Sequence, residues 1–155
     1  MSDVLAAVRQ HVTDRIGPQP SAASVTFLGM EPIEVLRFAD GDSVRYVTLG
    51  CSRYPMTPPE AMLADPIRGP RAELVLTVAT DTGPASGVHR TLAVLAAAPS
   101  VEGIVLAPDV RLDLGEPLWN GAVYTAVTLR ASEIPDLELP APADPVRFFE
   151  AEPTP

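Results

Sequence analysis

The chain has 155 residues, 46% of them hydrophobic and 20% charged, which is enough to bury one hydrophobic core and excludes disorder throughout. Twenty acidic residues outnumber 11 basic residues for a formal net charge of −9, and because no basic patch stands out we expect no nucleic-acid partner. A single cysteine excludes an internal disulfide bond, and no signal peptide is evident. No stretch approaches the roughly 20 apolar residues of a membrane-spanning helix. We therefore expect a cytoplasmic protein that does not bind membranes.

The first predicted element is a helix over residues 2–16. Ser2 is a suitable N-cap, and Gly17 and Pro18 should end the helix. Residues 18–24 are then expected to form a loop. The apolar residues of the helix recur at spacings of three and four, which places them on one stripe: Val4, Leu5, Val8, Val12 and Ile16.

Three strands are predicted next, over residues 25–28, 33–39 and 44–51, because these segments are rich in β-branched and aromatic residues. Residues 40–43 form the turn of the clearest hairpin. Gly41 can supply a positive φ there, and short polar side chains flank it.

A proline-punctuated segment over residues 52–71 is the first place where the sequence suggests a function. Structureless connections of about twenty residues are uncommon inside compact domains, and those that persist are often binding loops. The alternative is a short helix over residues 60–64 packed over a sheet edge, and the composition does not decide between the two. The candidates for exposed side chains in this segment are Tyr54, Met56, Met62 and Asp65.

The second half of the chain continues the sheet. Residues 73–80 are apolar on both faces, as is typical of a central strand that helices cover on both sides. Residues 83–87 are expected to form a flexible connector to a second helix, which Pro99 ends. The apolar face of that helix consists of Val88, Leu92, Leu95 and Ala96.

Three further strands are predicted over residues 110–114, 123–130 and 146–150. The acidic, proline-rich residues 131–145 between the last two are expected to wrap the surface. No internal repeat and no shift in composition divides the chain. The sequence therefore predicts one α+β domain over residues 1–155, with a mixed sheet of about six strands flanked by two principal helices.

Catalytic and cofactor-binding patterns are weak. The chain has no lysine, so a phosphate loop of the Gly-x-x-x-x-Gly-Lys type cannot occur, and we expect no cofactor and no metal. Cys51 or Ser52 with His89 as the base is the candidate pair for a small hydrolase. Cys51 ends an apolar strand, however, where lone cysteines usually act as small buried groups.

Two other features are each open to two interpretations. Asp109, Arg111 and Asp113 alternate on one strand face and form either a metal or acid–base group or, as we favour, a solvated ladder of ion pairs. Trp119 is either a core residue, as we favour, or an exposed anchor for a partner protein.

The order of several motifs resembles the Suppressor of fused domain. Residues 45–52 read Arg-Tyr-Val-Thr-Leu-Gly-Cys-Ser, and after a variable loop residues 72–76 read Ala-Glu-Leu-Val-Leu. A helix over residues 91–98, the Glu-Pro-Leu of residues 116–118 and a final strand over residues 146–149 complete a resemblance that covers residues 44–153. We assign structural roles to the motif residues Leu49, Gly50, Ser52, Glu73, Leu74, Pro117 and Leu118.

Three of these roles can be stated physically. Gly50 lets the chain turn sharply after a buried strand, and Ser52 can cap the exit. Glu73, near the start of the next strand, can accept hydrogen bonds from the loop backbone. These roles are architectural, so the motif itself implies no chemistry.

The resemblance implies a protein-binding module without catalytic activity. Eukaryotic members sequester transcription factors by taking an extended peptide as an added strand, whereas bacterial single-domain relatives are associated with toxin systems and are thought to act as immunity proteins. The absence of lysine, with all 11 basic residues being arginine, indicates a GC-rich, bacterial genome but says little about function. It is the acidic net charge that favours the bacterial type. The net charge of −9 fits a basic toxin as partner, because opposite charge accelerates capture.

We therefore hypothesise an immunity-type or sequestering protein that neutralises a partner protein. The alternatives are a regulatory or scaffold module that binds an extended peptide through residues 52–71 and a sheet edge, and the small hydrolase. The sequence does not fix the oligomeric state. The candidate partner-binding residues are Tyr54, Met56, Asp65, Asp109, Asp113 and Trp119.

Overall fold

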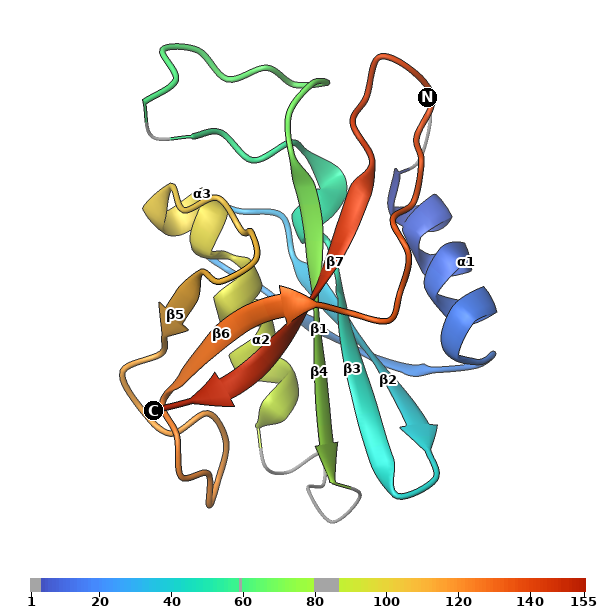
Figure 1. Ribbon diagram of the computed structural model, residues 1–155, viewed down its shortest axis with the longest axis vertical. Coiled ribbons are helices and arrows are strands. Elements are labelled where there is room, and N and C mark those ends of the chain that lie inside the picture. The colour runs from blue at the N-terminus through green and yellow to red at the C-terminus, as the bar shows by residue number, and fades with distance from the viewer. Residues whose placement is uncertain (1–3, 59, 80–86) are drawn as a thin grey trace.

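The computed structural model describes residues 4–58, 60–79 and 87–155, and within them the chain forms one mixed β-sheet with helices on both faces (Figure 1). The strand order is β1-β2-β3-β4-β7-β6-β5. β4 and β7 pair in parallel, and every other neighbouring pair in this sheet is antiparallel. The predicted α+β class is confirmed, with seven strands in place of about six.

The N-terminal helix α1 (Val4–Ile16) ends where the sequence predicts, and its Val8 and Val12 are fully buried. Ser2, the predicted N-cap, lies outside the described residues. The prediction of a loop over residues 18–24 was wrong. β1 (Ser21–Val25) occupies most of this segment, and of the predicted strand over residues 25–28 only Val25 belongs to a strand.

The central hairpin joins β2 (Ile33–Asp40) to β3 (Ser43–Leu49), and Gly41 has the expected positive φ of 62°. β3 ends two residues before the predicted boundary, and a single 3-10 turn, η1 (Cys51–Arg53), follows it. The long connection then leads to β4 (Arg71–Ala79). The alternative of a helix over residues 60–64 is not observed, since that stretch consists of a turn, two bends and irregular backbone.

The second predicted helix is α2 (Val88–Ala96), which is followed directly by the short α3 (Ala98–Glu102). Pro99 lies in the first turn of α3, a position where its missing N–H is not required, so it starts a helix as well as limiting the preceding one. Of the predicted connector over residues 83–87, only Gly87 lies within the described residues.

The remaining strands are β5 (Arg111–Asp113), β6 (Ala126–Ala131) and β7 (Val146–Thr154). The alternation predicted around β5 is confirmed, because Leu112 is buried between two exposed neighbours. Residues 132–145, which we call the acidic segment, run beside α1 at the upper right of Figure 1. Ile134 is buried, and Leu137 and Leu139 pack with the cluster under α1, so this segment is anchored by its apolar residues where only a surface wrap was predicted.

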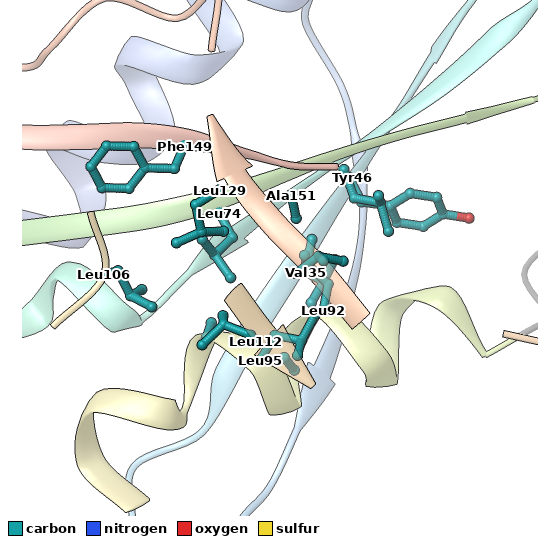
Figure 2. Close-up of a cluster of buried hydrophobic side chains, with 14 of the residues drawn as sticks. Val35, Tyr46, Leu74, Leu92, Leu95, Leu106, Leu112, Leu129, Phe149 and Ala151 are labelled. Atoms are coloured by element: carbon teal, nitrogen blue, oxygen red, sulfur yellow. The ribbon is translucent and has the colours of Figure 1, made fainter. Parts of the chain in front are cut away.

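Apolar side chains fill both faces of the sheet. The α2 side holds the larger cluster, in which Tyr46, Leu74 and Leu129 from the sheet meet Leu92 and Leu95 of α2 (Figure 2). The α1 side holds a second cluster that includes Val8, Val12 and Phe148. β4 is buried along most of its length because both clusters cover it, in agreement with its predicted central position.

Candidate interaction site

The buried carboxylate of Glu73 joins the start of β4 to the end of β3. Its side chain is 0% exposed and accepts five hydrogen bonds. The backbone N–H groups of Gly50, Cys51 and Ser52 donate at 2.9, 3.2 and 2.9 Å, and the hydroxyls of Ser52 and Thr48 donate at 2.5 and 2.7 Å. Such a set satisfies a buried carboxylate and fixes the path of the chain through η1.

The electrostatics of Glu73 reflect two opposing effects. Burial raises the pKa of its carboxyl group above the ordinary value, and the hydrogen bonds from Gly50, Ser52 and Thr48 partly offset this rise. Burial of the Cys51 thiol, reinforced by the nearby charge of Glu73, raises the pKa of Cys51 well above its ordinary value. The site is therefore built for structure, since its thiol is poorly ionised and its carboxylate is fully occupied by donors.

Gly50 is required for this turn. Its φ is 157°, and a Cβ added to it would lie 3.1 Å from the Cα of Ile33 and 3.3 Å from the carbonyl oxygen of Pro32. Both neighbours are backbone atoms, which cannot rotate away as a side chain can. The role predicted for Gly50 is thus supported by close packing as well as by its conformation.

Arg71 closes the base of the long loop. It is 4% exposed, and its guanidinium group donates to the carbonyl oxygens of Ser52, Arg53 and Ile67 at 2.9, 3.0 and 3.2 Å. A backbone hydrogen bond of 2.7 Å from Met56 to Pro70 ties the same two chain segments together. Residues 54–70, which we call the projecting loop, therefore leave and rejoin the sheet at one fixed base.

The projecting loop extends beyond the end of the sheet, above α3 in the view of Figure 1, and carries exposed apolar side chains. Met62 is 97% exposed and Leu63 is 88% exposed, while Tyr54 and Ile67 are exposed to a lesser degree. Asp65 is exposed and accepts hydrogen bonds from the N–H groups of Ile67 and Arg68, both at 2.9 Å. Asp65 thus shapes the loop tip as well as carrying charge.

The expectation that Met56 is exposed was wrong. Its side chain is only 4% exposed, belongs to the larger core cluster, and accepts a hydrogen bond from the N–H of Leu106 at its sulfur. The flexible thioether fills the space between the loop base and the core, a common use of methionine. Met56 therefore anchors the projecting loop and cannot reach a partner from its present position.

Two hollows flank the projecting loop. One, of about 460 Å³, lies between its base and α3 and is lined by Met30, Glu31, Arg53, Tyr54 and Pro99 among others. Glu31 lies at its rim, 3.6 Å from Arg53, and hydrogen bonding to Glu31 raises the pKa of Tyr54. The other, of about 470 Å³, is lined by residues 63–68 and by Pro142.

The second hollow brings the projecting loop next to the acidic segment. Within residues 132–145 the acidic side chains are Glu133, Asp136, Glu138 and Asp144. His11 of α1 hydrogen-bonds the carbonyl oxygen of Pro135 at 2.7 Å, and Ser132 donates to the carbonyl oxygen of Phe148 at 2.8 Å. These bonds hold the acidic segment against the sheet, so apolar and acidic groups share one end of the molecule.

The other predicted site residues lie elsewhere. Asp109 forms an ion pair with Arg130 at 2.5 Å, and Asp113 forms one with Arg111 at 3.5 Å. The favoured ladder of ion pairs is therefore present, but Asp109 pairs with an arginine of the neighbouring strand β6 and not with Arg111. Trp119 is half-buried against the larger core cluster, as the favoured interpretation requires. Leu118 is 1% exposed and its carbonyl oxygen accepts a hydrogen bond from the hydroxyl of Thr91, which supports a structural role for Leu118, whereas Pro117 is exposed.

The structure does not bring the candidate hydrolase residues together in one cavity. Cys51 lines the hollow beside α3, whereas His89 lines a separate pocket next to β1. Ser52 is 0% exposed, and its hydroxyl donates to Glu73. In the part of the chain that the structure describes, no group of three histidine, cysteine, aspartate or glutamate side chains is placed to hold a metal ion. No helix among the described residues is long and apolar enough to cross a membrane.

These features define a class of protein: an α+β module that presents an apolar loop on a base locked by buried ionic groups, as protein-interaction modules do. The chain belongs to the Suppressor of fused protein (SUFU) family, whose model matches residues 29–153. The match begins earlier than the resemblance over residues 44–153 and includes β2 and the Gly29–Glu31 wall of the first hollow. The family is a regulatory, protein-binding family and is not known for enzymatic activity. Comparisons with curated proteins and with solved structures gave no significant match.

Sequence reasoning missed three parts of the site. Arg71 was placed at the end of a loop, and Thr48 was treated as one strand residue among many. The available signal was the presence of Arg71 and Glu73 at the start of an otherwise apolar strand, because charged groups at such positions need buried partners. Leu63 was also missed, since one leucine in a proline-rich segment has no periodic pattern around it.

Proposed function

We propose that this protein binds and neutralises a partner protein, as an immunity-type or sequestering protein, and that the partner is basic. The binding surface consists of the projecting loop and the acidic segment beside it. The observation that carries the proposal is this juxtaposition, in which Met62 and Leu63 are almost fully exposed and Leu63 lines a hollow together with Pro142 of the acidic segment.

The apolar side chains supply a reason for binding. A large apolar side chain left in water lacks the stabilisation of about 1.5–3 kcal/mol that its burial would give. Met62, Leu63 and Ile67 together make an apolar patch that the fold does not cover. Partner interfaces commonly have a few apolar anchors at the centre and polar groups at the rim. The projecting loop has this composition.

The charge supplies the selectivity. The net charge is −9, and Asp136 and Glu138 are exposed in the segment next to the loop. A basic partner, such as a nuclease toxin whose own site attracts phosphates, is drawn to such a surface, and the attraction accelerates association. The locked base adds affinity because a fixed loop loses less conformational entropy on binding.

The test is co-expression with the product of the adjacent gene, followed by purification of the complex. We expect restored growth, a one-to-one complex with sub-micromolar affinity, and affinity that falls as salt is raised. The double variant Asp136→Asn/Glu138→Gln should weaken binding more than the matched control Glu102→Gln/Glu116→Gln, whose acidic residues are exposed elsewhere. A partner that is neither bound nor neutralised contradicts the proposal.

A regulatory module that binds an extended peptide is the second candidate. The observation in its favour is the hollow of about 460 Å³ beside Tyr54, which has apolar walls from Met30 and Pro99 and a polar rim from Glu31 and Arg53. Tyr54→Ala should remove peptide binding here without lowering the melting temperature, since that side chain is exposed. Neutralisation of a folded toxin that survives Tyr54→Ala favours the first candidate.

A further inference from the structure

The distribution of arginines singles out one peptide bond in the projecting loop. All 11 basic residues are arginine, and every arginine except Arg68 belongs to a helix, a strand or η1. Arg68 lies in the tip of the loop, residues 60–68, where every residue is exposed and the backbone is irregular. A protease that cuts after basic residues needs an accessible segment that can be drawn out straight. The bond between Arg68 and Gly69 is therefore the one of this type that the fold leaves open.

Few hydrogen bonds hold the tip closed. Asp65 accepts from the N–H groups of Ile67 and Arg68, and the carbonyl oxygen of Ile67 accepts from Arg71. No side chain of the tip is buried. Opening such a segment costs much less free energy than unfolding the sheet, so the tip can enter the active site of a protease while the rest of the chain stays folded.

Two other exposed arginines, each close to the end of an element, are protected by the core. Arg15 lies in the last turn of α1 beside Ile16, which packs on the cluster under α1. Arg111 precedes Leu112, which is 4% exposed and belongs to the larger core cluster. Cleavage at either position requires an apolar side chain to leave the protein, which adds about 1.5–3 kcal/mol to the cost of opening.

The base of the loop holds together without the tip. β3 pairs with β4, and the Glu73 carboxylate accepts from the N–H groups of Gly50 and Ser52. Arg71 donates to the carbonyl oxygens of Ser52 and Arg53. Because none of these bonds involves the tip, a chain that is cut there keeps its sheet assembled.

We propose that the bond between Arg68 and Gly69 is a processing site, at which an arginine-specific endoprotease cuts the native chain. Water adds across the peptide bond, which leaves a carboxylate on Arg68 and an amine on Gly69. The cut separates Met62 and Leu63 from the β4 side of the base, so the loop loses the fixed geometry that presents them. Cleavage thereby ends partner binding, a consequence that rests on the proposed function, whereas the site itself does not.

The experiment is limited proteolysis of the full native chain with trypsin, followed by intact-mass spectrometry and gel filtration. We expect residues 1–68 and 69–155 as the first products, and we expect the two fragments to elute together at the position of the intact chain. Arg68→Gln should slow the first cleavage at least about tenfold. The matched control Arg90→Gln, at an exposed arginine of α2, should leave its rate unchanged.

A variant of Asp65 tests the mechanism of opening. Asp65→Ala removes the two hydrogen bonds that close the tip, so it should speed up the first cleavage about three- to tenfold. An unchanged or slower rate would contradict local opening of the tip as the route to cleavage.

Partner binding by the cut chain tests the consequence. The cut chain should bind the purified partner at least about tenfold more weakly than the intact chain, since a loop held at one end loses more conformational entropy on binding. A first cut at another arginine, fragments that separate after the cut, or a cut chain that binds as the intact chain does would overturn the proposal. If the intact chain binds no partner, the proposed function fails, while the fragment masses still decide the processing site.

Discussion

The Ser52 hydroxyl donates to the Glu73 carboxylate at 2.5 Å, and the Ser52 amide donates to the same oxygen at 2.9 Å, across 21 positions of the chain. This pair fixes the exit of β3 against the entry of β4. The projecting loop, whose base lies between these two points, is thereby presented in one geometry. Stability of the base and presentation of the loop are therefore linked.

Glu73→Gln should lower the free energy of unfolding by about 2–4 kcal/mol, because a buried amide cannot accept from donors on both sides and directs its own N–H₂ at one set of them. Urea unfolding at pH 7 measures this. Glu152→Gln, an exposed change of the same type on β7, should leave the free energy nearly unchanged. Equal effects of the two substitutions would show that the Glu73 hydrogen bonds contribute little.

Gly50→Ala should destabilise the protein by about 1–3 kcal/mol. The added Cβ would contact the backbone of Pro32 and Ile33, and the alanine would have to adopt an unfavourable φ. Gly29→Ala is the matched control. Gly29 also has a positive φ, 78°, but no atom lies within 4 Å of the added Cβ, so only the conformational cost of about 1 kcal/mol applies. Denaturant unfolding compares the two, and a smaller loss for Gly50→Ala would argue against close packing at the turn.

Stability should depend on the ionisation of Glu150. Burial raises the pKa of Glu150 above its ordinary 4.5, although a hydrogen bond from Thr77 lowers it in part. A carboxyl group whose pKa is raised on folding stabilises the fold fully below the unfolded pKa, and this contribution is lost as the pH rises through the folded pKa. The stability of the wild type relative to Glu150→Gln should thus fall as the pH rises from about 4.5, the ordinary carboxyl value.

Urea unfolding between pH 4 and pH 7 measures that difference, with Glu152→Gln as the control on the same strand. The control variant shows how much of any change comes from replacing an exposed glutamate on that strand. Parallel stability curves for wild type and Glu150→Gln would contradict the assignment of a raised pKa to Glu150.

Cys51 should be inert towards alkylation in the folded protein. Burial and the charge of Glu73 raise the pKa of its thiol, and only the thiolate reacts readily. Iodoacetamide at pH 8 should modify native Cys51 at least about tenfold more slowly than the urea-unfolded chain, which mass spectrometry can follow. Comparable rates in the two states would show that the thiol is accessible and ionised, and would revive the hydrolase hypothesis.

Patterned segments were predictable and segments defined by distant partners were not. The stripe from Val4 to Ile16 identifies α1 because its apolar side chains repeat with the helical period. β1 was missed because serine and alanine have little preference for strands, and it is paired to β2 with Ala23 opposite Val35. Met56 was misassigned because its burial depends on Leu106, 50 residues away.

The candidate site was predictable in its location but only partly in its construction. Proline content located the projecting loop, and Gly50 and Glu73 have the structural roles that their chemistry suggested, whereas the Ser52 hydroxyl donates to Glu73 and does not cap the exit of the strand. The position of Arg71 in an apolar strand indicates that it needs buried partners, but the sequence does not identify those partners, since they are backbone carbonyl oxygens. Any sequence of the loop offers such acceptors.

Calorimetric titration of the purified partner with loop variants tests the central claim most directly. The double variant Met62→Ser/Leu63→Ser should weaken binding about 100-fold or more, with unchanged stability, because both side chains are exposed. Val123→Ser, at an apolar residue of 87% exposure outside the loop, should bind as the wild type does. Wild-type affinity in the loop variant, at one-to-one stoichiometry, would contradict the account.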